Sequence, residues 1–309
     1  MKITALASLC TLLPLTLHAA VYHSSDLGWK DGRDVSEEFA ALLESGKLKA
    51  GDELRLEHTY KISGTNTYEL PDGFTLSAVE DAGFDVVGAT PETKNTVFVL
   101  GDRTTLLNIT INYLNMPGLG SKGTNPKHGE DFGWMKGIHI SGKNDVVIKN
   151  CRLSGAIGKH IEMAEVCDRP KIVGCHIRGG YWTIHMSAND AVMRKCVVEQ
   201  YQGDGIKTSW AKRVLVEDCV FQDGGRDGID TTGGWENSIV RRTIFRRLFG
   251  GMDLKSLYNK ESHLKSPKNV GILVEECTFS DMGTAIAFTT TDKGHGFLDA
   301  GNVEKYAPH

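Results

Sequence analysis

A short apolar pattern recurs along this chain about every 23 residues. Each copy sets an isoleucine or methionine between small or polar residues, as in Gly205-Ile206-Lys207 and Gly228-Ile229-Asp230. The intervals between copies are 23, 23, 22, 23, 23 and 34 residues, and the central apolar residues are Ile138, Ile161, Ile184, Ile206, Ile229, Met252 and Ile286. Self-similarity at a fixed period of this length indicates a repeat architecture.

A second pattern runs in phase with the first. About thirteen residues after the apolar residue of most copies comes a cysteine, at positions 151, 175, 196, 219 and 277, with Thr243 taking this place in one copy. Runs of β-branched residues such as Val146-Val147-Ile148 precede these positions, and alternating pairs follow them. Alternation with β-branched residues, broken by Gly, Asn and Asp, predicts short strands.

Coils of 22–24 residues with two or three strands each predict an all-β fold, a right-handed parallel β-helix. Successive coils would lie about 4.8 Å apart, with the isoleucine column inside. The cysteines would then stack as an inward ladder of buried thiols rather than form disulfides. Cys167 lies outside this ladder.

The two ends of the chain carry different signals. Residues 1–20 are expected to be a signal peptide, because Lys2 is followed by an apolar run and small residues at Ala19 and Ala20. The mature protein is therefore expected to be secreted or periplasmic, without a membrane span. Residues 21–52 are expected to form an N-terminal cap with an amphipathic helix at 34–43, and residues 53–309 the β-helix. No comparable C-terminal cap precedes His309, so residues 296–309, a missing segment or a partner is expected to cover the last coil.

The residue after each central isoleucine faces outward, because successive strand side chains alternate. This column reads His139, Glu162, His185, Lys207, Asp230, Asp253 and Ala287. A second outward column, two residues further on, reads Ser141, Ala164, Ser187, Ser209, Thr232, Lys255 and Thr289. A solvated sheet face also carries charges, usually in unlike pairs. Titratable residues of three kinds on six successive rungs favour a functional site, with His139, Glu162 and His185 as substrate-binding residues.

Four aspartates are expected to converge on adjacent rungs: Asp204, Asp227, Asp230 and Asp253. Carboxylates this close repel one another unless they are protonated or neutralised. Oxygen ligands in this number suit Ca²⁺. A single Asp-Gly pair is usually only a turn former, but two aligned pairs with further aspartates beside them favour a metal site.

Two lysines share this surface, Lys207 and Lys255, and either is a candidate catalytic base. A bound cation would lower the pKa of a nearby lysine, whereas aspartates alone would raise it. Tyr258 is a candidate proton donor, and Arg226, Arg241 and Arg242 are candidates for holding substrate carboxylates. The formal net charge of −4 argues against a nucleic-acid partner.

The segments Gly203-Asp204-Gly205-Ile206, Asp227-Gly228-Ile229-Asp230 and Gly250-Gly251-Met252-Asp253-Leu254-Lys255 resemble the pectin-lyase-like β-helix superfamily. Within it, they are similar to the calcium-dependent family 9 pectate lyases and to β-helical alginate lyases. The resemblance implies that Asp204, Asp227 and Asp230 bind calcium and that a lysine one rung later is the base. Two positions depart from this pattern: Arg226 replaces an aspartate, and Asp253 stands where the family's lysine would be.

The sequence therefore predicts a lyase that cleaves an acidic, uronate-containing polysaccharide such as pectate or alginate by β-elimination. An epimerase that begins with the same proton abstraction remains an alternative. A β-helical glycoside hydrolase would use the same aspartates as acid and base. A carbohydrate-binding or adhesive solenoid would use the same groove without chemistry.

Overall fold

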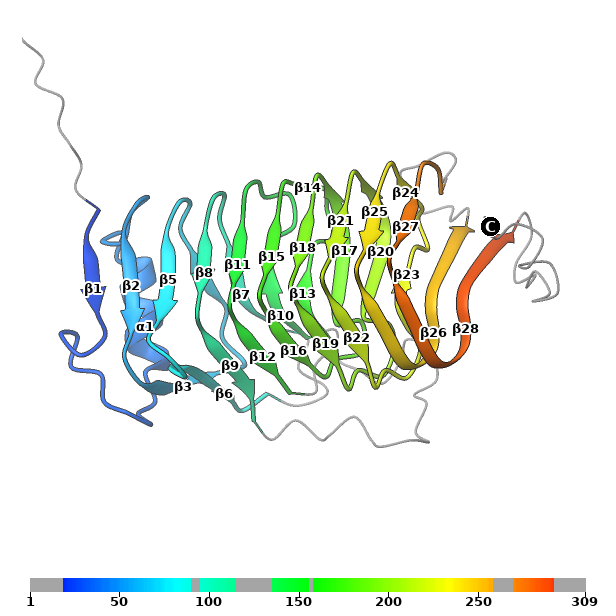
Figure 1. Cartoon of the computed structure of the whole chain (residues 1–309). Coiled ribbons are helices and arrows are strands. Elements are labelled where there is room, and N and C mark those ends of the chain that lie inside the picture. The colour runs from blue at the N-terminus through cyan, green and yellow to red at the C-terminus, as the bar shows by residue number, and fades with distance from the viewer. Residues whose placement is uncertain (1–18, 90–94, 115–134, 156–157, 258–268, 292–309) are drawn as a thin grey trace, which may run out of the picture.

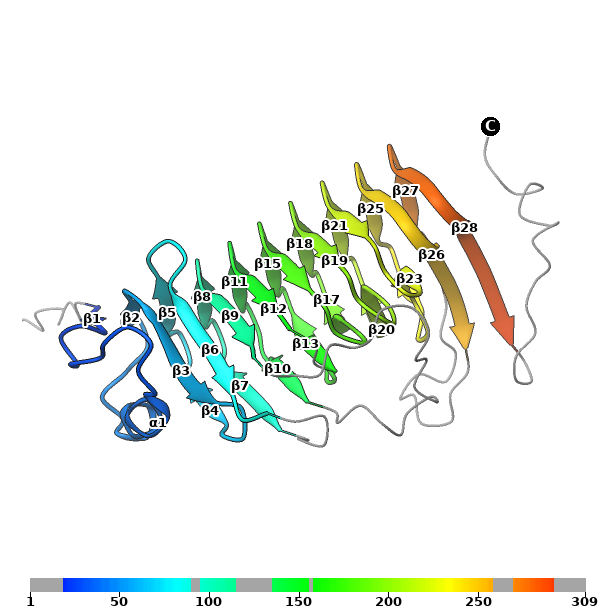
Figure 2. The ribbon, with the colours of Figure 1, turned by 90° about the horizontal axis from the view of Figure 1, so that it is seen from below.

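The computed structural model describes residues 19–89, 95–114, 135–155, 158–257 and 269–291. The predicted signal segment lies almost entirely outside these ranges and stays a prediction. Strands stack side by side from the N-terminal to the C-terminal end, and every strand pairing is parallel (Figures 1 and 2). The predicted parallel β-helix is confirmed.

One sheet of ten strands forms one wall of the β-helix. Its strands are short, because each coil turns again after three or four residues. They are β1 (Val21–His23), β2 (Glu53–Leu56), β5 (Thr75–Ala78), β8 (Thr105–Leu107), β11 (Val147–Lys149), β15 (Lys171–Val173), β18 (Val192–Arg194), β21 (Leu215–Glu217), β25 (Ile239–Arg241) and β27 (Leu273–Glu275).

The remaining strands form an eighteen-stranded sheet that contains two main columns. The first column comprises β3 (Thr59–Ser63), β6 (Gly83–Val87), β9 (Thr110–Tyr113), β12 (Arg152–Ser154), β16 (His176–Arg178), β19 (Val197–Glu199) and β22 (Val220–Gln222). The second comprises β4 (Tyr68–Leu70), β7 (Thr96–Leu100), β10 (Lys136–His139), β13 (Lys159–Glu162), β17 (Ile184–Asn189), β20 (Ile206–Lys212) and β23 (Asp227–Asp230). Two long strands, β26 (Ile244–Leu257) and β28 (Thr278–Thr291), continue both columns, and the short β14 (Cys167–Asp168) and β24 (Trp235–Glu236) pair with the ends of β17 and β20.

Like side chains stack on like inside the coils. The predicted isoleucine column is buried from Ile138 to Met252. Phe221, Phe245 and Phe279 form a second stack, with ring centroids 5.2 and 5.0 Å apart and nearly parallel planes. These spacings match the distance between neighbouring strands of a sheet. Each of these coils therefore contributes one phenylalanine to the stack.

The cysteine ladder is confirmed, and all six cysteines in the described part of the chain are free thiols. Cys151, Cys175, Cys196 and Cys219 stack on successive coils, and Thr243 takes the next place before Cys277. Cys167 is also buried, outside the ladder on β14, and donates to the carbonyl of Ile140 at 2.8 Å. The thiols behave as small core residues.

The N-terminal end is closed by the helix α1 (Ser36–Glu44), which packs on β3 and β4 (Figure 2). The helix begins two residues later than predicted, with Val35 as its N-cap residue. Just before it, Asp34 accepts hydrogen bonds from the Ser36 backbone N–H and hydroxyl. Phe39 of the helix is fully buried and stacks on Tyr68 and Phe84. The cap region also adds a strand to the ten-stranded sheet, because β1 pairs with β2.

The last coil is less buried than the others. Inward-facing residues of β27 and β28, such as Val274 and Ile286, are only partly buried in the described part of the chain. Residues 296–309, expected as a cover for this coil, lie outside the described ranges. Among the residues described, no helix has the length and apolar character needed to cross a membrane.

Candidate functional site

One outward column of side chains runs unbroken along the second strand column of the large sheet. The register pairs His139 with Glu162, Glu162 with His185, and His185 with Lys207. The column then continues from Lys207 to Asp230 and from Asp230 to Asp253. Six titratable side chains predicted from the repeat therefore lie on six neighbouring rungs.

Three aspartates converge at the C-terminal half of this column. Asp204 lies in the turn before β20, and Asp227 and Asp230 are the first and last residues of β23. All three are buried, and each places one carboxylate oxygen within 4.8 Å of the others. Because strand alternation would put Asp227 and Asp230 on opposite faces, it is the turn into β23 that brings them together.

Two lysine ammonium groups neutralise Asp230. Lys207 Nζ lies 2.5 Å and Lys255 Nζ 2.7 Å from the same oxygen, Asp230 Oδ2. Lys255 also pairs with Asp253 at 2.9 Å, and Lys207 lies 3.7 Å from Asp204. Burial alone would raise the pKa of Asp230, but the two lysines outweigh burial and lower it. Conversely, Asp230 and Asp253 outweigh the desolvation of Lys255 and raise its pKa.

Asp204 and Asp227 are less well compensated. Burial and the charge of Asp204 raise the pKa of Asp227 to about 7, and burial also raises the pKa of Asp204. In addition, Asp204 Oδ2 is buried without a hydrogen-bond partner among the described residues. Gly250 leaves space beside Asp227, since a Cβ there would lie 2.3 Å from Asp227 Oδ1.

These carboxylates fit a small hard cation. Three acidic oxygens within reach of one another form an incomplete set of the oxygen ligands that Ca²⁺ takes, and Asp204 Oδ2 has no hydrogen bond in the described chain. Asp253, the fourth predicted ligand, does not belong to this group: it pairs with Lys255 and accepts a hydrogen bond from Thr289 at 3.0 Å. Asp204, Asp227 and Asp230 are called the aspartate triad below.

The other half of the column is basic and is centred on Glu162. This carboxylate is 2% exposed and pairs with Lys136 at 2.5 Å, with His139 at 2.9 Å and, most closely, with Lys159. Burial would raise the pKa of Glu162, but the surrounding histidines and lysines hold it well below its usual range. Burial also lowers the pKa of Lys159. Two lysines, Lys136 and Lys159, surround the single carboxylate of Glu162, so this half of the column carries a net positive charge.

Trp182 lies between the basic and acidic halves. Lys159 Nζ is 5.5 Å and Lys207 Nζ 5.7 Å from the centre of its ring, within the range of cation–π contacts. The ring is also 5.8 Å from that of His185. The indole ring therefore contacts one lysine of the basic half and one lysine of the acidic half.

A β-bulge interrupts the column on β20. Met186 pairs with Thr208 but Ser187 pairs with Trp210, so Ser209 is an extra residue opposite β17. The expected second column therefore breaks here: Ser187 is buried, whereas Ser209 is exposed. The Ser209 hydroxyl instead lies 2.8 Å from His185 Nε2.

The predicted arginines separate into two groups. Arg226 precedes β23 and is close enough to Asp204 and Asp227 for their charges to raise its pKa against its own desolvation. Arg241 and Arg242 do not join the site: Arg241 ends β25 in the ten-stranded sheet, Arg242 follows it, and both pair with Glu217. Arg242 also pairs with Asp218 at 2.8 Å. Tyr258, the predicted proton donor, lies outside the described residues.

Sequence reasoning missed Lys136, Lys159 and Trp182. The signal was present, because each lies two residues before the central isoleucine of its coil, at the offset that also holds Asp204 and Asp227. Lys136 and Lys159 pair in register on β10 and β13. At this offset the chain is leaving a turn, so strict alternation does not assign the direction of the side chain.

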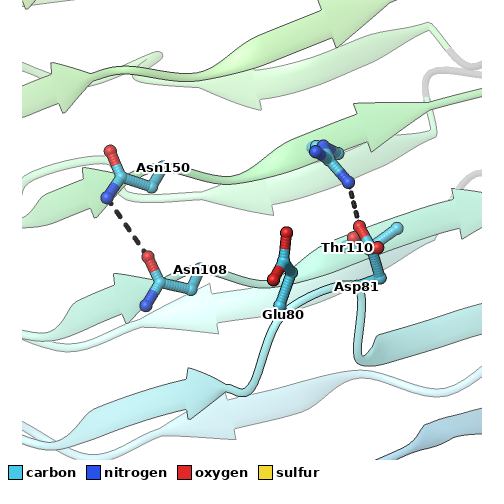
Figure 3. Close-up of a pocket in the computed structure, with 6 residues that line it drawn as sticks. Glu80, Asp81, Asn108, Thr110 and Asn150 are labelled. Atoms are coloured by element: carbon cyan, nitrogen blue, oxygen red, sulfur yellow. Dashed lines mark hydrogen bonds and ion pairs between the residues drawn. The ribbon is translucent and has the colours of Figure 1, made fainter.

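A separate hollow lies on the first strand column, lined by Glu80, Asp81, Asn108, Thr110, Asn150 and Arg152 (Figure 3). Asn150 donates to Asn108 at 3.2 Å, and an exposed ion pair joins Arg152 to Asp81. None of the column residues described above lines it. We assign it no function.

Comparisons with known proteins agree with this architecture. A family model described as a right-handed β-helix region matches residues 136–293. The surface adhesin PfbA of Streptococcus pneumoniae superposes with a TM-score of 0.58 at 12% identity, covering 89% of this chain and 82% of that one. A mannuronic acid specific polysaccharide family 6 lyase from human gut microbiota superposes with a TM-score of 0.43 at 13% identity, covering 90% and 77%.

A curated relative is the uncharacterized SPbeta prophage-derived protein YorA of Bacillus subtilis. It is 29% identical over 111 residues, which are 34% of this chain and 17% of the relative. The match thus spans about a sixth of that relative's length. The family model and the superposition on the adhesin show the fold alone, so the site residues have to carry any argument about function.

Proposed function

Because the chain belongs to the right-handed β-helix family, we propose that it uses this scaffold as a secreted lyase, cleaving a uronate-containing polysaccharide such as pectate or alginate by β-elimination. The observation that carries the proposal is the aspartate triad with two lysines on one of its carboxylates, next to a basic surface. An acidic polymer needs positive charge along its path, and the half of the column around Glu162 supplies it.

A β-elimination needs a neutralised sugar carboxylate and a base aimed at the C5 proton. Ca²⁺ held by Asp204, Asp227 and Asp230 would supply that neutralisation and favour the neutral amine of a neighbouring lysine. In its neutral amine form, Lys255 or Lys207 takes the proton, and both Nζ atoms lie within 3 Å of Asp230 at the edge of the aspartate triad. Arg226 holds a second substrate carboxylate from the turn before β23.

The basic half of the site binds neighbouring sugar units. His139 and His185 lie in register with Glu162, which holds Lys136 and Lys159 in place. Glu162 and Asp230 are three rungs apart, or about 14 Å at the usual strand spacing. An extended polymer lying across the strands would contact both halves at once.

A hydrolase is the second candidate, and the pKa pattern of the aspartates favours it. Asp227, with its pKa raised to about 7, would be protonated in about half of the molecules at neutral pH, whereas the lysines keep Asp230 ionised. One protonated and one ionised carboxyl group are what glycoside hydrolysis requires. The two reactions differ in their products, so a single assay separates them.

The test incubates the protein with polygalacturonate and with alginate, and follows both unsaturated-product absorbance and new reducing ends. We expect unsaturated products that disappear on addition of a chelator. Asp227→Asn should reduce the rate by roughly 100-fold or more, as loss of a group needed in the transition state does. Lys255→Met and Lys207→Met, measured separately, identify the base.

Asp218→Asn is the matched control, because Asp218 pairs with Arg242 away from the site. Reducing ends without unsaturation would replace the lyase by the hydrolase. Solvent deuterium entering the polymer without cleavage would indicate an epimerase. Binding without any turnover would leave a carbohydrate-binding or adhesive solenoid and end the enzymatic proposal.

A further inference from the structure

Ser209, His185 and Glu162 lie in line on three neighbouring strands. Ser209 Oγ is 2.8 Å from His185 Nε2, and His185 Nδ1 is 3.7 Å from Glu162 Oε1. A hydroxyl on one ring nitrogen and a carboxylate on the other is the arrangement of a nucleophile, its base and the group that orients the base. Such sets are recognised by geometry, since their order along the chain varies between folds.

Exposure increases along this line in the direction that a nucleophile needs. The side chain of Glu162 is 2% exposed and that of His185 is 12% exposed, whereas Ser209 is open to solvent. The carboxylate is therefore fixed inside the surface and the hydroxyl is accessible to a substrate. A serine that served only to anchor a surface histidine would not require a buried acid behind it.

The backbone at Ser209 is built around the bulge on β20. Ser209 is the extra residue opposite β17, and bulges of this kind re-aim a side chain. The neighbouring coil makes room for it: a Cβ at Gly233 would lie 1.1 Å from the carbonyl oxygen of Ser209. Only glycine fits there, so the next rung accommodates the serine that faces His185.

We propose that Ser209 is the nucleophile of a second activity, the hydrolysis of carboxylic esters carried by an acidic polysaccharide. Ser209 Oγ attacks the ester carbonyl carbon while its proton passes to His185 Nε2. The alcohol leaves with that proton, and an acyl group stays on Ser209. Water, deprotonated by His185, then releases the carboxylic acid and restores the serine. Glu162 is a positioning residue that orients the imidazole.

The surrounding charges suit this role. Burial lowers the pKa of His185, and the positive charges of Lys159 and Lys207 lower it further against the opposing effect of Glu162. The imidazole is therefore neutral near pH 7 and able to accept the serine proton. Lys159 Nζ lies 3.5 Å from Nδ1 but pairs more closely with Glu162. The proposed mechanism uses the tautomer in which Nδ1–H donates to Glu162 and Nε2 accepts the serine proton.

The chemical class of the ester follows from the same charges. The cations around Glu162 favour a sugar that carries a carboxylate close to its ester. Two kinds of ester meet this description, an O-acetyl group on a uronate and a methyl ester next to a free uronate. Incubation with acetylated and with methyl-esterified polyuronate separates them, since one releases acetate and the other methanol.

The direct test uses the full chain with chelator present throughout. The probes are 4-nitrophenyl acetate for turnover and a fluorophosphonate for covalent labelling of Ser209, located by mass spectrometry. Ser209→Ala and His185→Gln should each reduce ester hydrolysis by roughly 100-fold or more and abolish the label. Ser280→Ala, a serine on β28, is the matched control and should retain both.

The pH–rate profile tests the positioning role of Glu162. Because Glu162 raises the pKa of His185, Glu162→Gln should move the rising limb of the profile to lower pH as well as reduce the rate. A merely structural role would reduce the amount of active protein without moving the limb. An unmoved limb would remove Glu162 from the mechanism.

The proposal is overturned if hydrolysis by the wild type survives Ser209→Ala, or if the fluorophosphonate reacts elsewhere. It stands independently of the lyase: Asp227→Asn or a chelator should abolish elimination and leave ester hydrolysis intact. Loss of both activities in Asp227→Asn would contradict the separation of the two sites. Loss of neither would contradict the lyase alone.

Discussion

Glu162 has an environment in which a buried charge is retained only because opposite charges surround it. Lys159, with 7% of its side chain exposed, contacts this carboxylate, as do Lys136 and His139, and His185 lies 3.7 Å away. Taking one partner from such a group leaves the others desolvated and uncompensated. The residue that holds the basic half of the site together is thus an acid.

Glu162→Gln should lower the free energy of unfolding by about 3 kcal/mol or more at pH 7, because Lys159 loses its buried counter-charge. The folded pKa of Glu162 is lowered, so its stabilising contribution is complete above the unfolded value of about 4.3 and is lost as the pH falls toward the folded pKa. Urea unfolding at pH 7 and pH 3 measures this.

The difference between wild type and Glu162→Gln should therefore shrink on acidification. Lys159→Met combined with Glu162→Gln should recover part of the loss, since the unpaired ammonium group is then absent. A Glu162→Gln protein as stable as the wild type at pH 7 would show that the ion pairs contribute nothing. Glu69→Gln, in the exposed position of β4, is the control.

At the scale of single elements, β20 differs from the strands beside it. Its bulge exposes Ser209, and its outer residues Lys207 and Ser209 face the two halves of the site. A regular strand would have paired Ser187 with Ser209 and placed two small hydroxyls side by side. The bulge instead places the Ser209 hydroxyl beside His185, a contact that the regular repeat would not produce.

Gly233→Ala tests this accommodation. A Cβ would overlap the Ser209 carbonyl, which is backbone and cannot move aside, so we expect a loss of about 1–3 kcal/mol. Ester hydrolysis should fall together with stability, because the bulge is displaced. Gly283→Ala is the control, since the nearest atom there, the Phe249 carbonyl oxygen, is 3.1 Å away. Equal unfolding midpoints for the two variants would contradict the argument.

Across the whole molecule, stability comes from stacked columns rather than from covalent cross-links. The ladder thiols donate to backbone carbonyls, as Cys196 does to Ile172, and lie among apolar residues. The first and last coils are the places where this stacking must stop. α1 and Phe39 close the first coil, while the inward columns of β27 and β28 remain partly exposed in the described chain.

Thermal melts with and without a thiol reductant should therefore coincide. Reduction of a structural disulfide would lower the free energy of unfolding by about 2–5 kcal/mol and with it the melting temperature. Free thiols are already reduced, so the reductant should not change the stability. A disulfide-containing protein melted alongside shows that the reductant is active. A melting temperature that falls on reduction would mean that the cysteines are cross-linked.

The sequence alone determined the coil length, the inward isoleucine and cysteine columns and the outward line from His139 to Asp253. It could do so because in-register stacking of a fixed-length coil converts sequence spacing directly into spatial adjacency. Only the tertiary structure decided which turn residues join that line. It added Lys136, Lys159 and Trp182, removed Arg241 and Arg242, and aimed Ser209 at His185. Turns and bulges break strict alternation, so the direction of a side chain there depends on the coils packed on either side.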